Sequence, residues 1–178
     1  MKDIVYDTPT ITHAARRHTL AVLVDNEFGV LARVIGLFSG RGYNIESLTV
    51  AEVEHDKKKS RITIVTSGTE MVVEQIKKLL GKMVPVYKVH DLTVEGPHVE
   101  RELALVKVAG MNGNHEEALK TADVFGARVV DSTAQSFVFE LTGESAKLDQ
   151  FVELMRPLGL IEICRTGVAA MSRGKEGI

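Results

Sequence analysis

The stretch that decides the fold spans residues 25–48 and reads DNEFGVLARVIGLFSGRGYNIESL. A short apolar run, 20–24, precedes it and predicts a strand. Four apolar residues then recur at the spacing of one face of an amphipathic helix: Leu31, Val34, Ile35 and Phe38. Because Gly40 and Gly42 end that pattern, the stretch predicts a strand, a tight turn, a helix and a second strand that begins near residue 44.

The turn at residues 26–29 is a candidate binding site. A helix start offers backbone N–H groups that have no partner within the helix, and these groups can hold a carboxylate or a phosphate. The side-chain amides of Asn26 and Asn44 could add further hydrogen bonds. The alternative is that Asn26 and Gly29 serve only the geometry of the turn, and the spacing alone leaves both interpretations open.

The composition indicates a globular protein that binds neither nucleic acid nor a membrane. Hydrophobic residues make up 44% of the 178 residues and charged residues 26%, as in ordinary soluble domains. The net charge is −2 with both signs well mixed, so no basic face for nucleic acid is expected. The single cysteine, Cys164, excludes an internal disulfide. Residues 1–17 lack the apolar core of a signal peptide, and no apolar run approaches the roughly 20 residues of a membrane span. We therefore expect a cytoplasmic protein.

The first half of the chain is predicted to contain four strands and two helices. In order they are strand 18–24, helix 29–40, strand 44–53, strand 61–66, helix 69–80 and strand 84–92. Gly36 lies in the middle of the first helix, where glycine costs about 1 kcal/mol relative to alanine. A close approach of that helix to the sheet would explain why a glycine is there.

The second half repeats this order of elements. The pattern predicts strand 101–109, helix 114–125, strands 127–131 and 136–141, helix 145–155 and strand 160–170. Asn114 and Glu117 resemble a capping box at the start of the helix. Residues 74–80 also align with residues 149–155 at an offset of 75, which indicates an internal repeat.

The predicted fold is therefore α+β, with two tandem ferredoxin-like βαββαβ domains. We expect an N-terminal arm at 1–17, a first domain at 18–94, a linker at 95–100 and a second domain at 101–178. Each four-stranded sheet would have two edge strands, and open edges favour pairing with a second copy of the chain.

Patterns that would indicate catalysis are weak. The glycines within 36–42 end a helix, whereas a dinucleotide-binding fingerprint opens one after a strand. His98 and Glu100 could be two metal ligands, but a solvated linker is the simpler interpretation. Cys164 lies in an apolar strand and is expected to be a small buried residue rather than a nucleophile. We expect neither catalytic residues nor a metal site in this chain.

Two longer runs carry a family resemblance. Residues 23–34, LVDNEFGVLARV, resemble the start of an ACT domain, a small-molecule-sensing ferredoxin-like module. Residues 33–50, RVIGLFSGRGYNIESLTV, are similar to the regulatory small subunit of acetohydroxyacid synthase, also called acetolactate synthase. Residues 98–103 and 172–174 fit the same family, so the resemblance covers about residues 18–174. Phe28 stands where that family commonly has a small residue.

The resemblance implies a regulatory subunit that is not catalytic alone. Such a subunit binds a large subunit that carries thiamine diphosphate, FAD and magnesium and condenses pyruvate with pyruvate or 2-oxobutyrate. It raises the activity of the large subunit and conveys feedback inhibition by valine, and in some cases by leucine or isoleucine. This reaction is the first step of branched-chain amino-acid synthesis.

The resemblance also implies an effector site between the ACT domains of a homodimer. Six residues are expected to form it: Asn26, Gly29, Val30, Leu31, Asn44 and Ile45. The backbone N–H groups of residues 29–31 would hold the carboxylate of valine at the helix N-terminus. The side-chain amides of the two asparagines, one from each subunit, would bind the polar ends of the amino acid. The side chains of Leu31 and Ile45 would line the pocket for its apolar group. Residues 109–114 lack this pattern, so no effector site is expected in the second domain.

Two other classes of function are alternatives to a regulatory subunit. An amino-acid-responsive transcription regulator would need a DNA-binding element, and no helix-turn-helix module precedes the first predicted strand. A small enzyme on the ferredoxin-like fold would need a convergent set of acids and bases, which the sequence does not suggest. Assays of the chain alone and with candidate large subunits separate the three.

Overall fold

The structure is a computed structural model that describes residues 14–54, 56, 58–110, 115–175 and 177–178. Residues 1–13 of the predicted arm and Asn114 of the predicted capping box therefore lie outside the described residues. Residues 16 and 17, which the sequence analysis assigns to the arm, already belong to the first strand.

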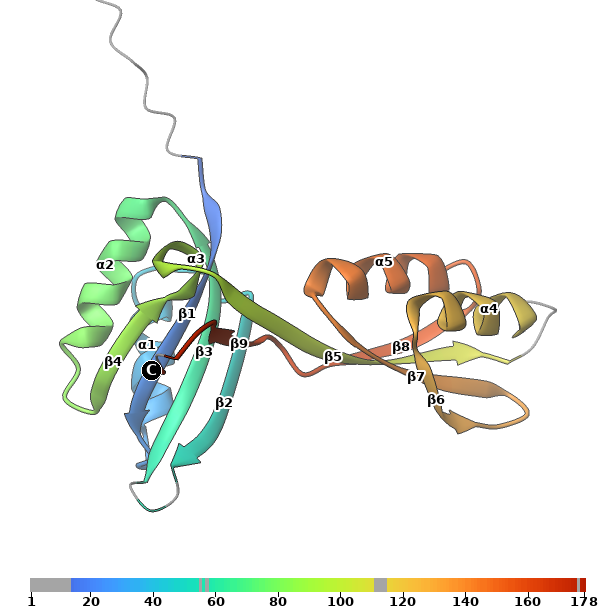
Figure 1. Cartoon of the computed structure of the whole chain (residues 1–178), viewed down its shortest axis with the longest axis horizontal. Helices are drawn as coiled ribbons and strands as arrows, with labels where there is room; N and C mark the ends of the chain where they lie inside the picture. The colour runs from blue at the N-terminus through green and yellow to red at the C-terminus, as the bar shows by residue number, and fades with distance from the viewer. Residues whose placement is uncertain (1–13, 55, 57, 111–114, 176) are drawn as a thin grey trace, which may run out of the picture.

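The first half forms a four-stranded antiparallel sheet with two helices on one face (Figure 1). Its elements are β1 (Arg16–Asp25), α1 (Val30–Ser39), β2 (Ser47–Glu54), β3 (Lys59–Gly68), α2 (Glu70–Gly81), β4 (Val86–Asp91) and the short α3 (Leu92–Glu95). The strands lie in the order β2-β3-β1-β4. Alternate residues of the two central strands point to the helices, where they pack against the apolar helix faces. The buried residues of this core, from strands and helices, include Leu20, Val22, Val34, Phe38, Ile62, Ile64 and Ile76.

The second half repeats the same topology. Its elements are β5 (His98–Ala109), α4 (His115–Phe125), β6 (Arg128–Ser132), β7 (Ser136–Gly143), α5 (Ser145–Met155) and β8 (Leu160–Arg165), with a final strand β9 (Ala169–Ser172). The first four strands lie in the order β6-β7-β5-β8. A second core between this sheet and its helices contains Ala104, Val106, Phe139, Leu148 and Phe151. The predicted α+β class with two βαββαβ units is thus confirmed.

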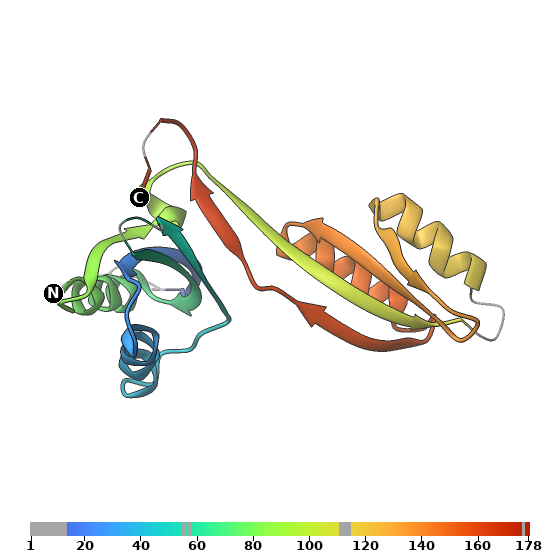
Figure 2. The ribbon, with the colours of Figure 1, turned by 90° about the horizontal axis from the view of Figure 1, so that it is seen from below.

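Strand β5 links the two halves. Its first residues, 98–101, pair with β9, and residues 102–109 pair with β7 (Figure 2). Residues 98–100, which the sequence analysis places in a linker, are therefore part of a strand. The hydrogen-bonding partner that makes them a strand comes from the far end of the chain, so no local pattern reveals it.

The predicted last strand, 160–170, is wrong as a single element. It is divided into β8 and β9 around Gly167, which has a φ of 82°. Beyond this break the chain returns to the first sheet, on the face opposite α1 and α2, where Val168 and Ala170 pack against Ala21 and Val65. Residues of the predicted second domain thus cover part of this face of the first sheet.

Cys164 is exposed, so its predicted burial is wrong. It lies opposite Leu105 on β5, whereas the preceding residue, Ile163, lies opposite the core residue Val106. Cys164 therefore points to the face of the second sheet that the helices do not cover. Apolar neighbours in sequence suggested burial, but only one face of this sheet carries helices.

The explanation offered for Gly36 is also wrong. Gly36 is exposed, and a Cβ atom added to it would meet no other atom within 4 Å. The glycine is therefore not required by a close approach of α1 to the sheet within one chain.

We expect Gly36→Ala to stabilise the protein by about 1 kcal/mol, because alanine loses less backbone entropy on forming a helix. The measurement is urea unfolding followed by circular dichroism. Gly81→Ala, at the end of α2, also adds a methyl group in open space and should change stability less, because it lies in the last helical position. A loss of stability in Gly36→Ala would show that this position is packed in the assembled protein.

Candidate functional site

The start of α1 has the features expected of an anion-binding helix terminus. Gly29 occupies the position before the helix with a φ of 80°, in the left-handed region. No side chain caps the helix, and its first turn, which the structure describes in full, contains no acidic residue. The N–H of Val30 reaches only the carbonyl of Glu27, at 3.4 Å. The N–H groups of this turn are thus available to a negatively charged ligand.

Neighbouring strands hold this turn in place. The N–H of Asp25 donates to the carbonyl of Pro85 at 2.9 Å, and the N–H of Asn26 donates to the carbonyl of Lys58 at 2.7 Å. The carboxylate of Asp25 accepts hydrogen bonds from Tyr87 Oη at 2.7 Å and Lys59 Nζ at 3.0 Å. The hydrogen bond from Tyr87, followed by that from Lys59, holds the pKa of Asp25 below its usual value. A carboxylate that stays ionised keeps both contacts at neutral pH.

The other half of the predicted site lies at the opposite end of α1. Asn44 and Ile45 follow the helix, whereas Asn26 precedes it, and a helix of 10 residues is about 15 Å long. The hydroxyl of Thr66 donates to the backbone carbonyl of Asn44 at 2.6 Å and ties this loop to β3. One chain therefore does not bring the two asparagine side chains together.

Exposure further separates the six predicted residues. Val30 is buried and Ile45 is half-buried against the first core, so neither side chain is fully open to a ligand in a single chain. The other four are exposed: Asn26, Gly29, Leu31 and Asn44. Phe28, beside them on the turn, is also fully exposed.

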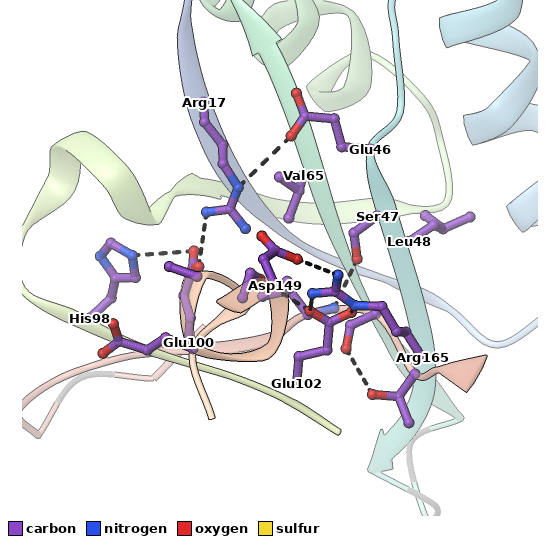
Figure 3. A pocket seen from close by; sticks show the side chains of 16 residues that line it. Arg17, Glu46, Ser47, Leu48, Val65, His98, Glu100, Glu102, Asp149 and Arg165 are labelled. Atoms are coloured by element: carbon purple, nitrogen blue, oxygen red, sulfur yellow. Dashed lines mark hydrogen bonds and ion pairs between the residues drawn. The ribbon is translucent and has the colours of Figure 1, made fainter. Parts of the chain in front are cut away.

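A cavity lies between the two halves, next to residues 46–48 (Figure 3). Its volume is about 900 Å³. Side chains from β1, β2, β5, the start of α5 and the β8–β9 connection line it, including Arg17, Glu46, Ser47, Glu100, Glu102 and Arg165. None of the six predicted effector residues lines this cavity.

One wall of the cavity is an ion pair with two hydrogen bonds. Arg165 on β8 donates through Nε to one oxygen of Glu102 at 3.0 Å and through Nη2 to the other at 2.6 Å. Its third nitrogen donates to Asp149 at 2.6 Å, and Ser145 donates to Glu102 at 3.1 Å. Glu102 is only 6% exposed. The hydrogen bonds to Glu102 are the main cause of a raised pKa for Arg165, so the guanidinium stays charged at neutral pH.

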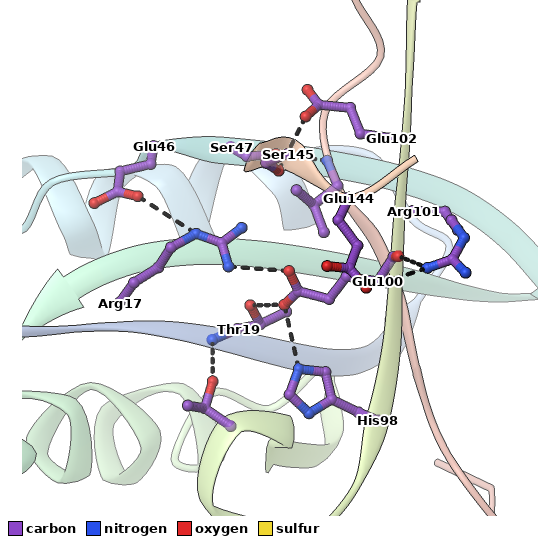
Figure 4. Close-up of polar contacts among 12 residues, drawn as sticks. Arg17, Thr19, Glu46, Ser47, His98, Glu100, Arg101, Glu102, Glu144 and Ser145 are labelled. Atoms are coloured by element: carbon purple, nitrogen blue, oxygen red, sulfur yellow. Dashed lines mark hydrogen bonds and ion pairs between the residues drawn. The ribbon is translucent and has the colours of Figure 1, made fainter. Parts of the chain in front are cut away.

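The opposite wall joins β1 to the start of β5 (Figure 4). Arg17 Nη1 donates to Glu100 at 2.9 Å, and the hydroxyl of Thr19 donates to the same carboxylate. Burial alone raises the pKa of Glu100, but these hydrogen bonds and the charge of Arg17 outweigh it and lower the pKa below its usual value. His98 Nε2 lies 3.4 Å from Glu100.

The sequence did not predict this cavity because its lining residues are divided among a predicted arm, a linker, a helix and several strands. Arg17 and Glu100 are 83 positions apart, and no sequence spacing indicates their pairing. Within the described residues, no group of three or more histidine, cysteine, aspartate or glutamate side chains is arranged to hold a metal ion. Glu100 contacts Arg17 and Thr19 on β1, and His98 lies beside Glu100.

Comparison with known proteins identifies the family. A family model described as the AHAS small subunit-like ACT domain matches residues 20–88, and one described as the small subunit of acetolactate synthase matches residues 101–174. The chain is 46% identical over 159 residues to the acetolactate synthase isozyme 3 small subunit of Escherichia coli, covering 89% of this chain and 96% of the relative. The chain belongs to the acetolactate synthase small-subunit family.

Further relatives agree with this assignment. The acetolactate synthase small subunit of Aquifex aeolicus is 44% identical, covering 89% of this chain and 82% of the relative. The crystal structure of the acetolactate synthase small subunit from Thermotoga maritima is 35% identical and superposes with a TM-score of 0.82, covering 90% of this chain and 99% of that one.

Membership in the acetolactate synthase small-subunit family confirms three of the predictions. The first half is an ACT domain, the chain is a regulatory and non-catalytic subunit, and it acts in branched-chain amino-acid synthesis together with an acetolactate synthase large subunit. As a separate finding, none of the helices in the described residues is long and apolar enough to cross a membrane.

Proposed function

We propose that this chain senses valine, or another branched-chain amino acid, and conveys feedback inhibition to its large subunit. One observation carries the proposal: α1 begins at an exposed, uncapped turn with Gly29 in the left-handed region. Such a turn suits the carboxylate of a free amino acid, because the helix dipole and the free N–H groups act together. Leu31, partly exposed on the same turn, is an apolar contact for a branched side chain.

The effector site is completed by a second copy of the chain. Asn26 and Asn44 lie at opposite ends of α1, so a ligand that contacts both needs one asparagine from each protomer. The edge strands β2 and β4 of the first sheet offer unpaired backbone groups for association. We therefore propose a homodimer built through the ACT domains.

The catalytic chemistry belongs to the partner in this proposal. The large subunit carries thiamine diphosphate, FAD and magnesium, and this chain supplies activation and effector control. We place the complex in the cytoplasm, where a single exposed thiol such as Cys164 stays reduced.

The test is a titration followed by reconstitution. Calorimetry of the purified chain with valine, leucine and isoleucine should give saturable binding, and sedimentation should give a dimer or a larger assembly. The chain alone should make no acetolactate, whereas adding it to the large subunit should raise activity and make that activity sensitive to valine.

Two results would contradict this proposal. The first is strong acetolactate production by the chain in a preparation shown to be free of large subunit. The second is a strict monomer at micromolar concentration that still binds valine at full strength, because a shared site requires two chains.

A further inference from the structure

The connection between β8 and β9 lies on the face of the first sheet that α1 and α2 do not cover. Residues 47 and 49 of β2 lie opposite Val65 and Thr63 of β3. The neighbouring β3 residues Ile62 and Ile64 point the other way, into the core beneath the helices. The side chains of Ser47 and Thr49 thus share the uncovered face with Val65, against which the returning chain packs.

Two hydroxyl groups of β2 bind both backbone polar groups of one residue in the returning chain, Val168. Ser47 Oγ accepts a hydrogen bond from the N–H of Val168 at 2.8 Å, and Thr49 Oγ1 donates to the carbonyl of Val168 at 2.9 Å. We call Ser47, Thr49, Gly167 and Val168 the junction clamp. The clamp holds the backbone of the second half directly on the first sheet.

Gly167 fits the clamp because it has no side chain. A Cβ atom there would lie 2.8 Å from Ser47 Oγ and 3.1 Å from Thr49 Cγ2. The backbone of Gly167 also has a φ of 82°, a conformation that residues with a side chain rarely adopt. Any other residue at this position would push the connection away from β2.

The loop at residues 44–46 leads straight into the clamp. Ser47 follows this loop, which contains two of the predicted effector residues. Glu46 lies 3.8 Å from Arg17, which in turn binds Glu100 on β5 at 2.9 Å. The loop therefore contacts both segments that enter the second half: β5 through Arg17, and the β8–β9 connection through Ser47. The 900 Å³ cavity between these contacts leaves room for the two halves to change their relative position.

We propose that the junction clamp couples the effector site to the second half of the subunit. Effector binding at residues 44–45 shifts the start of β2, and the clamp passes that shift to the β8–β9 connection. Ser47, Thr49 and Gly167 are positioning residues in this scheme. The scheme rests on the proposed function, because it assigns the loop to effector binding.

The test measures movement, binding and inhibition separately. Spin labels at Lys78→Cys on α2 and Lys120→Cys on α4, in a Cys164→Ser background, report the distance between the halves. Both lysines are exposed, and dilution with unlabelled chain isolates distances within one protomer. The same preparations are titrated with valine and assayed with the large subunit. The variants are Ser47→Ala, which removes one hydrogen bond, and Gly167→Ala, which opens the clamp sterically.

In the unaltered chain, valine should shift the distance distribution. In Ser47→Ala the Kd for valine should stay within about threefold, while the distance shift and at least half of the maximal inhibition are lost. Gly167→Ala should behave likewise. Gly174→Ala is the matched control, because Gly174 also has a positive φ, 101°, but has open space around an added Cβ; it should keep both responses.

Each other outcome counts against a distinct claim. If both clamp variants keep the valine-dependent shift and full inhibition, the coupling proposal falls while the effector site stands. The same holds if inhibition is lost only in proportion to valine affinity. If the unaltered chain binds none of the three branched-chain amino acids, the proposed function falls, and the coupling falls with it.

Discussion

Gly29→Asp is expected to raise the valine concentration needed for half-maximal inhibition more than tenfold. The new carboxylate would lie beside the carboxylate of the ligand at the start of α1. Two like charges about 4 Å apart repel by roughly 4 kcal/mol at an effective dielectric constant near 20. Even half of that free energy weakens binding by more than tenfold. Because Gly29 is exposed and outside both cores, the fold should persist.

The measurement is an inhibition curve of the reconstituted complex, next to a thermal melt of the variant. Gly29→Asn is the matched control, since it has nearly the same shape and tolerates the left-handed region about as well, but carries no charge. It should lose much less valine sensitivity than the aspartate variant. Asn26→Asp tests the same charge effect from the neighbouring side chain. Unchanged valine sensitivity in both aspartate variants, with folded protein, would place the effector site elsewhere.

Arg165→Met is expected to destabilise the chain by about 3 kcal/mol. Glu102 is 6% exposed and receives two of its hydrogen bonds from Arg165. Removing the arginine leaves a buried carboxylate with Ser145 as a weak remaining donor. Breaking a buried ion pair from one side typically costs about 3–5 kcal/mol. We take the lower value because the side chain of Arg165 is 32% exposed.

Urea unfolding of a small set of variants tests this reasoning. The double variant Arg165→Met/Glu102→Leu should recover most of the loss, because it removes the unpaired charge as well. Lys107→Met breaks an exposed ion pair with Glu162 in the same sheet and should cost less than about 1 kcal/mol. Equal losses in the single and double variants would show that packing by the arginine stem, rather than charge, stabilises this wall.

Much of the fold is encoded locally. The periodic apolar residues of 30–39 and 145–155 form helices where the sequence places them. The internal repeat also predicts the shared topology of the two sheets correctly. These features depend on residue spacing along one helix or strand, and the hydrophobic effect acts on that spacing before any distant contact forms.

The sequence by itself therefore determined the fold class and the family, and the family resemblance predicts an effector site at the turn with Gly29. Only the tertiary structure decided where the last strand breaks, that Cys164 is exposed, and that Arg17 meets Glu100. The reason is physical, because each of these three features depends on contacts with residues that are distant in sequence. The free energy of such a contact cannot be predicted from the local residue pattern of either segment alone. The junction clamp is the plainest case, since the sequence places Gly167 inside one continuous strand, whereas its contact with Ser47 appears only in the structure.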